Sequence, residues 1–185
     1  MSYLIFYILF VSAISLGSAA SLLLDVFFFI SLTHRRLKIH EVKNLKLLSG
    51  ISTISIVVSI AALISLLSFR IGYGLYSGDS MLFILSALLL VAFACSLNMR
   101  NVHLPALKRH QHDYHHLSES FKHHQTSLLS TSVVSIVTWI FVLTLIAADA
   151  RDVTLIVNFW QIIVSYIVIA YVLSKITVFL KRKIG

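Results

Sequence analysis

The stretch that decides the fold is LLSGISTISIVVSIAALISLLSF, residues 47–69, which contains no charged residue. About 20 apolar residues in a row cross the hydrocarbon core of a bilayer as a helix. Four further stretches meet this criterion, and the only charge within them is at Asp25. The predicted spans are residues 3–33, 47–69, 81–99, 127–148 and 153–174. Because a helix satisfies its own backbone hydrogen bonds in lipid, we expect an all-α membrane bundle of five transmembrane helices.

The composition agrees with one membrane domain. Hydrophobic residues make up 58% of the 185 residues, charged residues make up 12%, and the mean hydropathy is +0.94. Soluble domains rarely reach this apolarity. The longest polar stretch, residues 100–125, is too short for a separate domain, so residues 1–185 are interpreted as one bundle with a histidine-rich cytoplasmic connector at 100–125. The patch at residues 17–20 lacks a preceding basic region, so we expect a retained helix rather than a removed signal peptide.

The basic residues predict the orientation. With five crossings, thirteen of the 15 lysines and arginines fall on one face, and only Arg70 and Arg151 fall on the other. Because basic residues concentrate on the cytoplasmic side, we expect the N-terminus outside and the C-terminus in the cytoplasm. The expected location is the cell membrane, the inner membrane of a prokaryote. Although the net charge is +8, the charges flank apolar segments, which favours the lipid bilayer over nucleic acid as partner. The sequence is compatible with a homo-oligomer and does not predict the oligomeric state.

All nine histidines lie outside the predicted spans and on the predicted cytoplasmic face. Imidazole is the commonest protein ligand for transition metals, and residues three or four apart on a helix share a face. The segment KRHQHDYHHLSESFKHHQ, residues 108–125, therefore predicts a site for a divalent metal such as Zn, Fe, Ni or Cu. The predicted ligands are His112, His115, His116, His123 and His124, together with His34, His40 and His103. We expect a role in metal transport or sensing, and a solvated polar spacer is the alternative.

The run His112-Asp113-Tyr114-His115-His116 resembles a histidine box of membrane desaturases and hydroxylases. That resemblance implies a diiron oxidoreductase with its irons at the cytoplasmic ends of the helices. The chain departs from the pattern because it has no second HxxHH, and because His34 and His40 are six residues apart. A b-type haem would need two histidines facing each other inside the bundle, and no predicted span contains one. The sequence predicts no catalytic residues.

Asp25 and Asn98 are the predicted intramembrane polar site. Asp25 lies eight residues before the end of its span, on the order of 12 Å from the boundary. A carboxylate in lipid is costly, so Asp25 should face the bundle interior. It could act as a proton or cation site, which would make the protein a channel, or it could form a buried hydrogen bond. Asn98 is expected to form a hydrogen bond between helices, and the serines of the spans are interpreted as sites of close helix packing.

Residues 17–65, which begin GSAASLLLDVFFFISLTHRRLKIHEVKNLKLLSG, resemble a group of small, uncharacterised prokaryotic integral membrane proteins. The shared features are small residues followed by an acid and Phe in the first span, then a basic connector. Asn98, Pro105 and the histidine-bearing connector before a serine-rich fourth span fit the same outline. The resemblance implies a multi-spanning topology and no particular activity.

Overall fold

The computed structural model describes residues 2–33, 39–72, 80–106, 119–149 and 159–184, with side chains placed at 3–28, 42–69, 82–106, 126–147 and 161–179. The described residues form five long helices, and each is long and apolar enough to cross a membrane. The all-helical class and the number of helices are therefore confirmed. The helices are α1 (Ser2–Thr33), α2 (Ile39–Gly72), α3 (Ser80–Asn98), α5 (Glu119–Asp149) and α6 (Phe159–Ile184).

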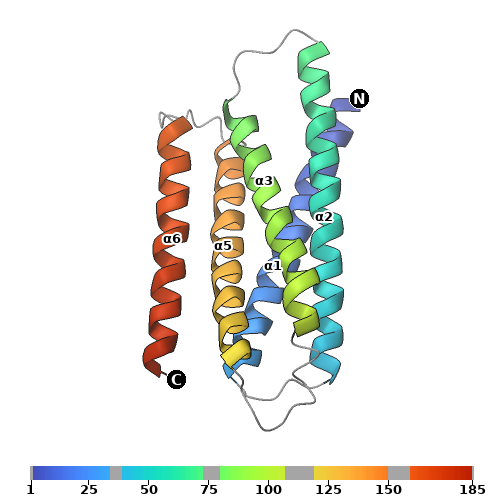
Figure 1. Cartoon of the computed structure of the whole chain (residues 1–185). Coiled ribbons are helices and arrows are strands. Elements are labelled where there is room, and N and C mark those ends of the chain that lie inside the picture. Colours follow the sequence, from blue (N-terminus) through green and yellow to red (C-terminus); the bar gives the residue numbers. More distant parts are fainter. Residues whose placement is uncertain (1, 34–38, 73–79, 107–118, 150–158, 185) are drawn as a thin grey trace.

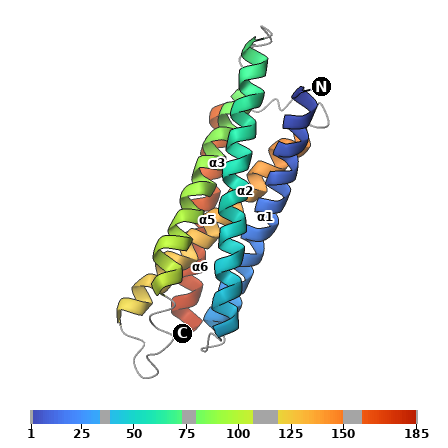
Figure 2. The same cartoon turned by 90° about the vertical axis from the view of Figure 1, so that its right-hand side faces the viewer.

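The helices are arranged as a core of four with a fifth on the outside. Helix α1 packs on α2 and α5, α2 packs on α3, and α3 packs on α5, so these four helices enclose one interior. Helix α6 packs mainly on α5 and has a smaller contact with α3. Successive helices run in opposite directions, which leaves the N-terminus at one end of the bundle and the C-terminus at the other (Figures 1 and 2).

Several helices extend beyond the predicted spans. Helix α2 has 34 residues, which correspond to about 51 Å, whereas the hydrocarbon core is about 30 Å thick. The first turns of α2 contain the exposed Lys43, Asn44 and Lys46 beside the buried Leu45. The sequence predicts a connector for these residues, because their polarity conceals a helix that continues beyond the apolar run. Helix α6 likewise continues to Ile184, beyond the predicted boundary at residue 174.

A close contact between three helices fixes their register. A Cβ atom built on Gly17 would lie 3.0 Å from Cβ of Ser55 on α2 and 3.3 Å from Cη2 of Trp139 on α5. Only a residue without a side chain fits so close to its neighbours, which confirms the close packing expected of the small residues in α1. Trp139 is 1% exposed, and its indole fills the space that Gly17 leaves.

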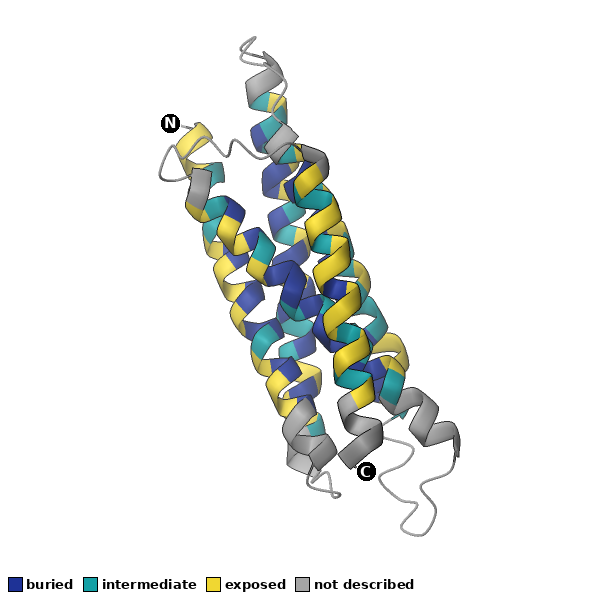
Figure 3. Cartoon of the chain, turned by 90° about the vertical axis from the view of Figure 1, so that its left-hand side faces the viewer, coloured by how far each residue is buried: buried dark blue, intermediate teal, exposed yellow. Residues whose placement is uncertain are grey.

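Two apolar cores fill the two ends of the four-helix interior (Figure 3). The core nearer the N-terminus, called the N-end core, includes Phe10, Ile14, Ile56, Leu63, Leu89, Trp139 and Val142. The core nearer the C-terminus, called the C-end core, consists of Leu24, Phe28, Leu45, Met99, Leu104 and Leu128. Between them the interior is lined mainly by polar side chains.

Helix α6 is attached to α5 by two pairs of hydroxyl groups. The hydroxyls of Thr138 and Tyr166 are 2.8 Å apart, and those of Ser130 and Ser174 are 2.7 Å apart. The Tyr166 ring also packs edge-on against Phe141 at 5.4 Å. Most of the remaining surface of α6 is exposed (Figure 3) and apolar, with Gln161, Ser165 and Lys175 as exposed polar residues, a pattern typical of a helix that faces lipid.

Candidate functional site

A layer of buried polar side chains lies between the N-end core and the C-end core. This set, called the polar layer, comes from all four core helices and from the turn that follows α3. Its members are Ser21, Asp25, Ser49, Ser52, Thr53, Ser96, Asn98, His103, Thr131, Ser132 and Ser135. Most of them are under 9% exposed, and Asn98 and Thr131 are partly buried. These residues lie at a common level along the bundle because the helices pack antiparallel. On α1, Asp25 is about two turns beyond Gly17 toward the C-end core.

Asp25 faces the interior, so its predicted burial is confirmed. Its side chain is 1% exposed, and the hydroxyls of Ser132 and Ser135 lie beside its carboxyl group. Neither Oδ2 of Asp25 nor Oγ of Ser132 forms a hydrogen bond within the described part of the chain. Asp25 is the only acid whose side chain the structure describes, and a lone carboxylate in an apolar bundle needs a compensating partner.

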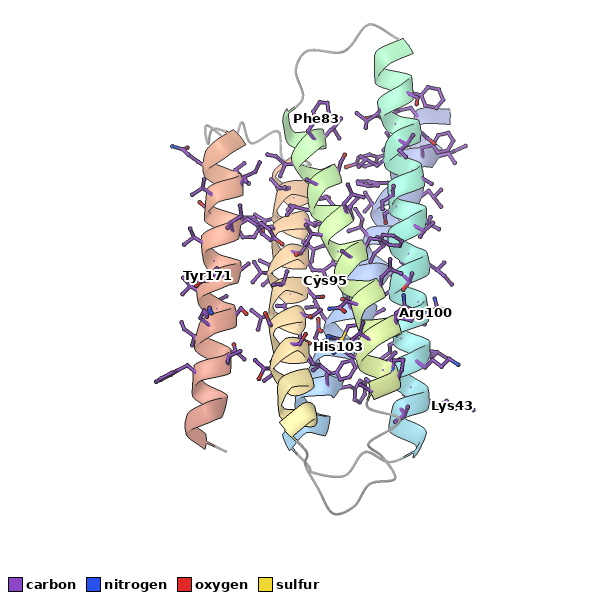
Figure 4. All side chains as sticks on the ribbon, viewed as in Figure 1. Lys43, Phe83, Cys95, Arg100, His103 and Tyr171 are labelled. Carbon is purple, nitrogen blue, oxygen red and sulfur yellow. The ribbon has the colours of Figure 1, made fainter. Side chains whose placement is uncertain are left out.

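The described basic side chains do not supply that partner. Lys43, Lys46, Arg100 and Lys175 are all exposed, and Figure 4 shows Lys43 and Arg100 on the outer side of α2 and α3. The described groups beside Asp25 are therefore hydroxyls, and the same polar layer also contains the amide of Asn98 and the imidazole of His103. It can compensate a negative charge by hydrogen bonding, or it can share that charge with a bound cation.

Hydroxyl pairs join the core helices at this level. Ser21 on α1 and Ser135 on α5 are 3.0 Å apart, and Thr53 on α2 and Ser96 on α3 are 2.8 Å apart. Thr53 also donates to the carbonyl of Ser49 at 2.8 Å. The predicted role of the serines in helix packing is therefore correct for these pairs, and it is incomplete for the serines closest to Asp25.

His103 belongs to this interior, although it had been assigned to the aqueous connector. Residues Met99–His103 form one turn of π-helix, called η1, in which the N–H of Leu104 bonds to the carbonyl of Met99. The helical path then continues to Ala106, so His103 lies within a candidate span, Leu82–Ala106. Its side chain is 1% exposed. The expectation that no span contains a histidine is wrong at this position.

The side chain of His103 reaches the polar layer from the side of the C-end core. Side chains in a helix tilt toward its N-terminus, so the imidazole of His103 points back toward α3 (Figure 4). Its Nε2 atom lies 3.4 Å from Nδ2 of Asn98 and 3.5 Å from Oγ1 of Thr131. Asn98 also donates to Thr131 at 3.2 Å, which confirms the hydrogen bond between helices that was predicted for Asn98.

The contacts among Asn98, Thr131 and His103 are consistent with the following arrangement of hydrogen atoms. Thr131 donates its hydroxyl hydrogen to the carbonyl of Ser127 at 2.9 Å, which leaves its oxygen to accept from Asn98. The second hydrogen of the Asn98 amide can then point to Nε2 of His103, which accepts it through its lone pair. In this arrangement His103 is a neutral imidazole with its hydrogen on Nδ1. A π-turn inside an α-helical segment often occurs at a functional site.

The structure does not bring the predicted metal ligands together among the residues it describes. His34, His112, His115 and His116 lie outside the described residues, and so does His110. His40, His123 and His124 lie in the first turns of α2 and α5, where side chains are not placed. Within the described side chains there is no group of three His, Cys, Asp or Glu residues that could hold a metal ion.

Sequence reasoning identified Asp25 and Asn98 and missed the residues around them. Ser49, Ser52, Ser132 and Thr131 belong to the polar layer because of the order in which the helices pack, which the apolar runs do not encode. His103 was missed because Arg100 and Asn101 made its segment look like a connector. Comparisons with protein-family models, with curated proteins and with solved structures gave no match.

Proposed function

We propose that this chain is a multi-pass membrane protein that binds a cation at Asp25 in its interior and moves it across the bilayer. One observation supports this proposal above all: the Asp25 carboxyl group is 1% exposed and lies in a polar layer between two apolar cores. Acidic residues inside membrane bundles are costly, and they typically belong to ion or proton pathways.

The chemistry of the polar layer favours a cation. Around the carboxyl group it offers the oxygen atoms of Ser132 and Ser135, and the described basic side chains are exposed. Burying a charge without a counter-charge is unfavourable. A proton or a metal ion bound at Asp25 would neutralise the carboxylate without any further change in the bundle.

The apolar cores on both sides of the layer favour a closed site over an open pore. Toward the C-terminal end the layer is covered by Leu24, Phe28 and Leu45, and toward the other end by Ile14, Ile56 and Trp139. A cation at Asp25 would therefore be enclosed, and its passage would require the helices to shift, as in a carrier or a gated pathway.

The proposal includes the orientation and the location. The end of α1, the start of α2 and the start of α5 lie at the end of the bundle that also holds the C-terminus (Figure 1). Thirteen of the 15 lysines and arginines fall at this end in the five-span arrangement. The bias toward basic residues supports a cytoplasmic position for this end, in a cell membrane.

Cation flux into liposomes tests the proposal. The purified chain would be reconstituted, and the entry of protons, Na⁺ and K⁺ would be followed with fluorescent indicators. We expect flux from the wild type and its loss in Asp25→Asn. Asp79→Asn is the matched control, because Asp79 falls outside the candidate spans in the sequence. Equal flux from the wild type and Asp25→Asn would contradict the proposal.

A second candidate is the binding of a divalent transition metal at the end that carries the histidines. It is favoured because the helix ends that flank both histidine-bearing segments lie at the same end of the bundle (Figure 1). The proposed ligands are His112, His115, His116, His123 and His124, and the role would be metal transport or sensing. Imidazole nitrogens suit zinc, nickel, copper and iron.

Calorimetry with those four metals tests this second candidate. We expect binding to the wild type and weaker binding to a His112→Ala, His116→Ala double variant. His103→Gln serves as the comparison, because His103 lies in the polar layer, away from this group in the sequence. Equal heats for the wild type and the double variant would remove these ligands. An optical spectrum with a Soret band would instead indicate haem.

A further inference from the structure

Four buried oxygen atoms of the polar layer have no hydrogen-bond partner within the described part of the chain. They are Oδ2 of Asp25, Oγ of Ser49, Oγ of Ser52 and Oγ of Ser132. Each of these residues is at most 1% exposed. Buried polar atoms are nearly always hydrogen-bonded or bound to an ion, so four such atoms in one layer require an explanation.

The three serines differ from the other hydroxyls of the bundle. A serine or threonine within a helix commonly donates to the carbonyl four residues earlier. Ser15, Ser59, Ser86 and Thr131 do this at 2.7–2.9 Å, as do several other hydroxyls of this chain. Ser49 and Ser52 do not, and Ser132 lies instead beside the Asp25 carboxyl group. Lone pairs of these three hydroxyl oxygens therefore remain available to a ligand.

The packing places these oxygens at one level. The Ser132 hydroxyl lies beside the Asp25 carboxyl group. Ser55 lies against Gly17, and because α1 and α2 are antiparallel, the two turns from Gly17 to Asp25 correspond to two turns back along α2, near Ser49. Ser52 is one turn from Ser49 on the same helix. The three helices α1, α2 and α5 thus present oxygen atoms to a shared interior.

The oxygens and the charge select the class of ion. Oxygen ligands suit hard cations, and soft or borderline metals prefer sulfur and nitrogen. A single carboxylate neutralises one positive charge, and the other six acids of the chain lie outside the candidate spans. A divalent ion would keep an uncompensated charge in a medium of low dielectric constant, and Mg²⁺ also gives up its water ligands reluctantly.

We infer that the polar layer binds a monovalent alkali metal cation through Asp25, Ser132, Ser49 and Ser52. This inference depends on the proposed function and names its substrate. The ion would satisfy all four oxygens at once, whereas a proton on Asp25 would satisfy only its own oxygen and one acceptor. Trapped water is the other species that could occupy the layer.

Thermal unfolding of the purified full-length chain tests the inference. The protein would be heated at constant pH and ionic strength in the chlorides of Li⁺, Na⁺, K⁺, Mg²⁺ and N-methylglucamine. A ligand that binds only the folded state raises the unfolding temperature with its concentration. We expect one of the alkali cations to raise it most, Ser132→Ala and Ser49→Ala to reduce this shift, and Asp25→Asn to abolish it. Ser15→Ala is the control, because Ser15 is exposed on α1.

The outcomes separate this inference from the proposed function. Equal unfolding temperatures of the wild type in all five salts would overturn the inference and leave water or a proton in the layer. If proton flux in liposomes were still lost in Asp25→Asn, the proposed function would stand although the inference of a bound metal cation had failed. A larger shift with Mg²⁺ than with any of the alkali cations would also overturn the monovalent assignment. If Asp25→Asn changed neither flux nor the salt response, both proposals would fail.

Discussion

The amide Nδ2 of Asn98 on α3 donates a hydrogen bond of 3.2 Å to Oγ1 of Thr131 on α5. Thr131 in turn donates to the carbonyl of Ser127, and both Asn98 and Thr131 lie within 3.5 Å of Nε2 of His103. One threonine oxygen thus connects α3, the π-turn η1 and α5. This connection holds the imidazole of His103 at the edge of the polar layer.

Removing this oxygen should loosen the contact between α3 and α5. Thr131→Val leaves the Asn98 amide without its acceptor at nearly constant volume, and we expect a loss of about 1 kcal/mol in the free energy of unfolding. Thr131→Ser keeps the oxygen and should lose much less. Unfolding in mixed micelles with a rising fraction of denaturing detergent measures both variants. Similar stability of the valine and serine variants would show that the hydrogen bond contributes little.

The contact at Gly17 predicts a contrast between two glycines. Gly17→Ala places a Cβ 3.0 Å from Cβ of Ser55, so α1 and α2 must separate, and overpacking of this kind costs about 1–3 kcal/mol. Gly50→Ala meets nothing within 4 Å, and alanine is favoured over glycine in a helix by about 1 kcal/mol. The same unfolding measurement should therefore show Gly17→Ala destabilised and Gly50→Ala unchanged or stabilised. Equal effects would contradict the close approach of α1 and α2.

The sequence predicted the number of helices because each crossing needs its own long apolar run. Its boundaries were less accurate where a helix continues beyond the apolar run, as in the exposed turn at Lys43 and Lys46. The packing order could not be predicted, because apolar residues surround α1, α2, α3 and α5 almost evenly. A pattern without a preferred face does not indicate which neighbour each face contacts.

The candidate site was predictable only in part, for the same reason. Asp25 stood out because a single acid in an apolar run is costly wherever it packs. Ser49 and Ser132 look like ordinary serines of membrane helices, and only the packing shows that both are buried and that Ser132 lies beside Asp25. His103 required knowledge of the π-turn, because an imidazole that follows Arg100 and Asn101 resembles a residue of an aqueous loop.

Asp25→Asn should leave the fold intact while it removes the function. The amide has nearly the same shape as the carboxyl group, and it is uncharged, so the variant avoids the cost of a buried carboxylate. In a medium free of alkali cations we expect its unfolding temperature to equal or exceed that of the wild type. Asp25→Leu supplies no polar group to Ser132 and Ser135, and should be less stable than the amide. A large loss of stability in Asp25→Asn would indicate that the carboxylate has a structural role.

The attachment of α6 gives a last prediction, based on two tyrosines of the same helix. The Tyr166 hydroxyl lies 2.8 Å from Oγ1 of Thr138, which itself donates to the carbonyl of Val134 at 2.7 Å. Tyr166 is therefore the donor of the pair, and Tyr166→Phe should cost about 0.5–1.5 kcal/mol. Tyr171, whose side chain is 62% exposed, provides the matched control.

Tyr171→Phe removes the same atom from a surface position and should change the stability little. Amide hydrogen exchange is the suitable measurement, because α6 contacts mainly α5 and can separate from it without unfolding of the four-helix core. We expect faster exchange confined to α6 in Tyr166→Phe. Unchanged exchange in α6, or an equal increase in Tyr171→Phe, would mean that apolar packing alone, including the contact of Phe141 with the Tyr166 ring, keeps α6 in place.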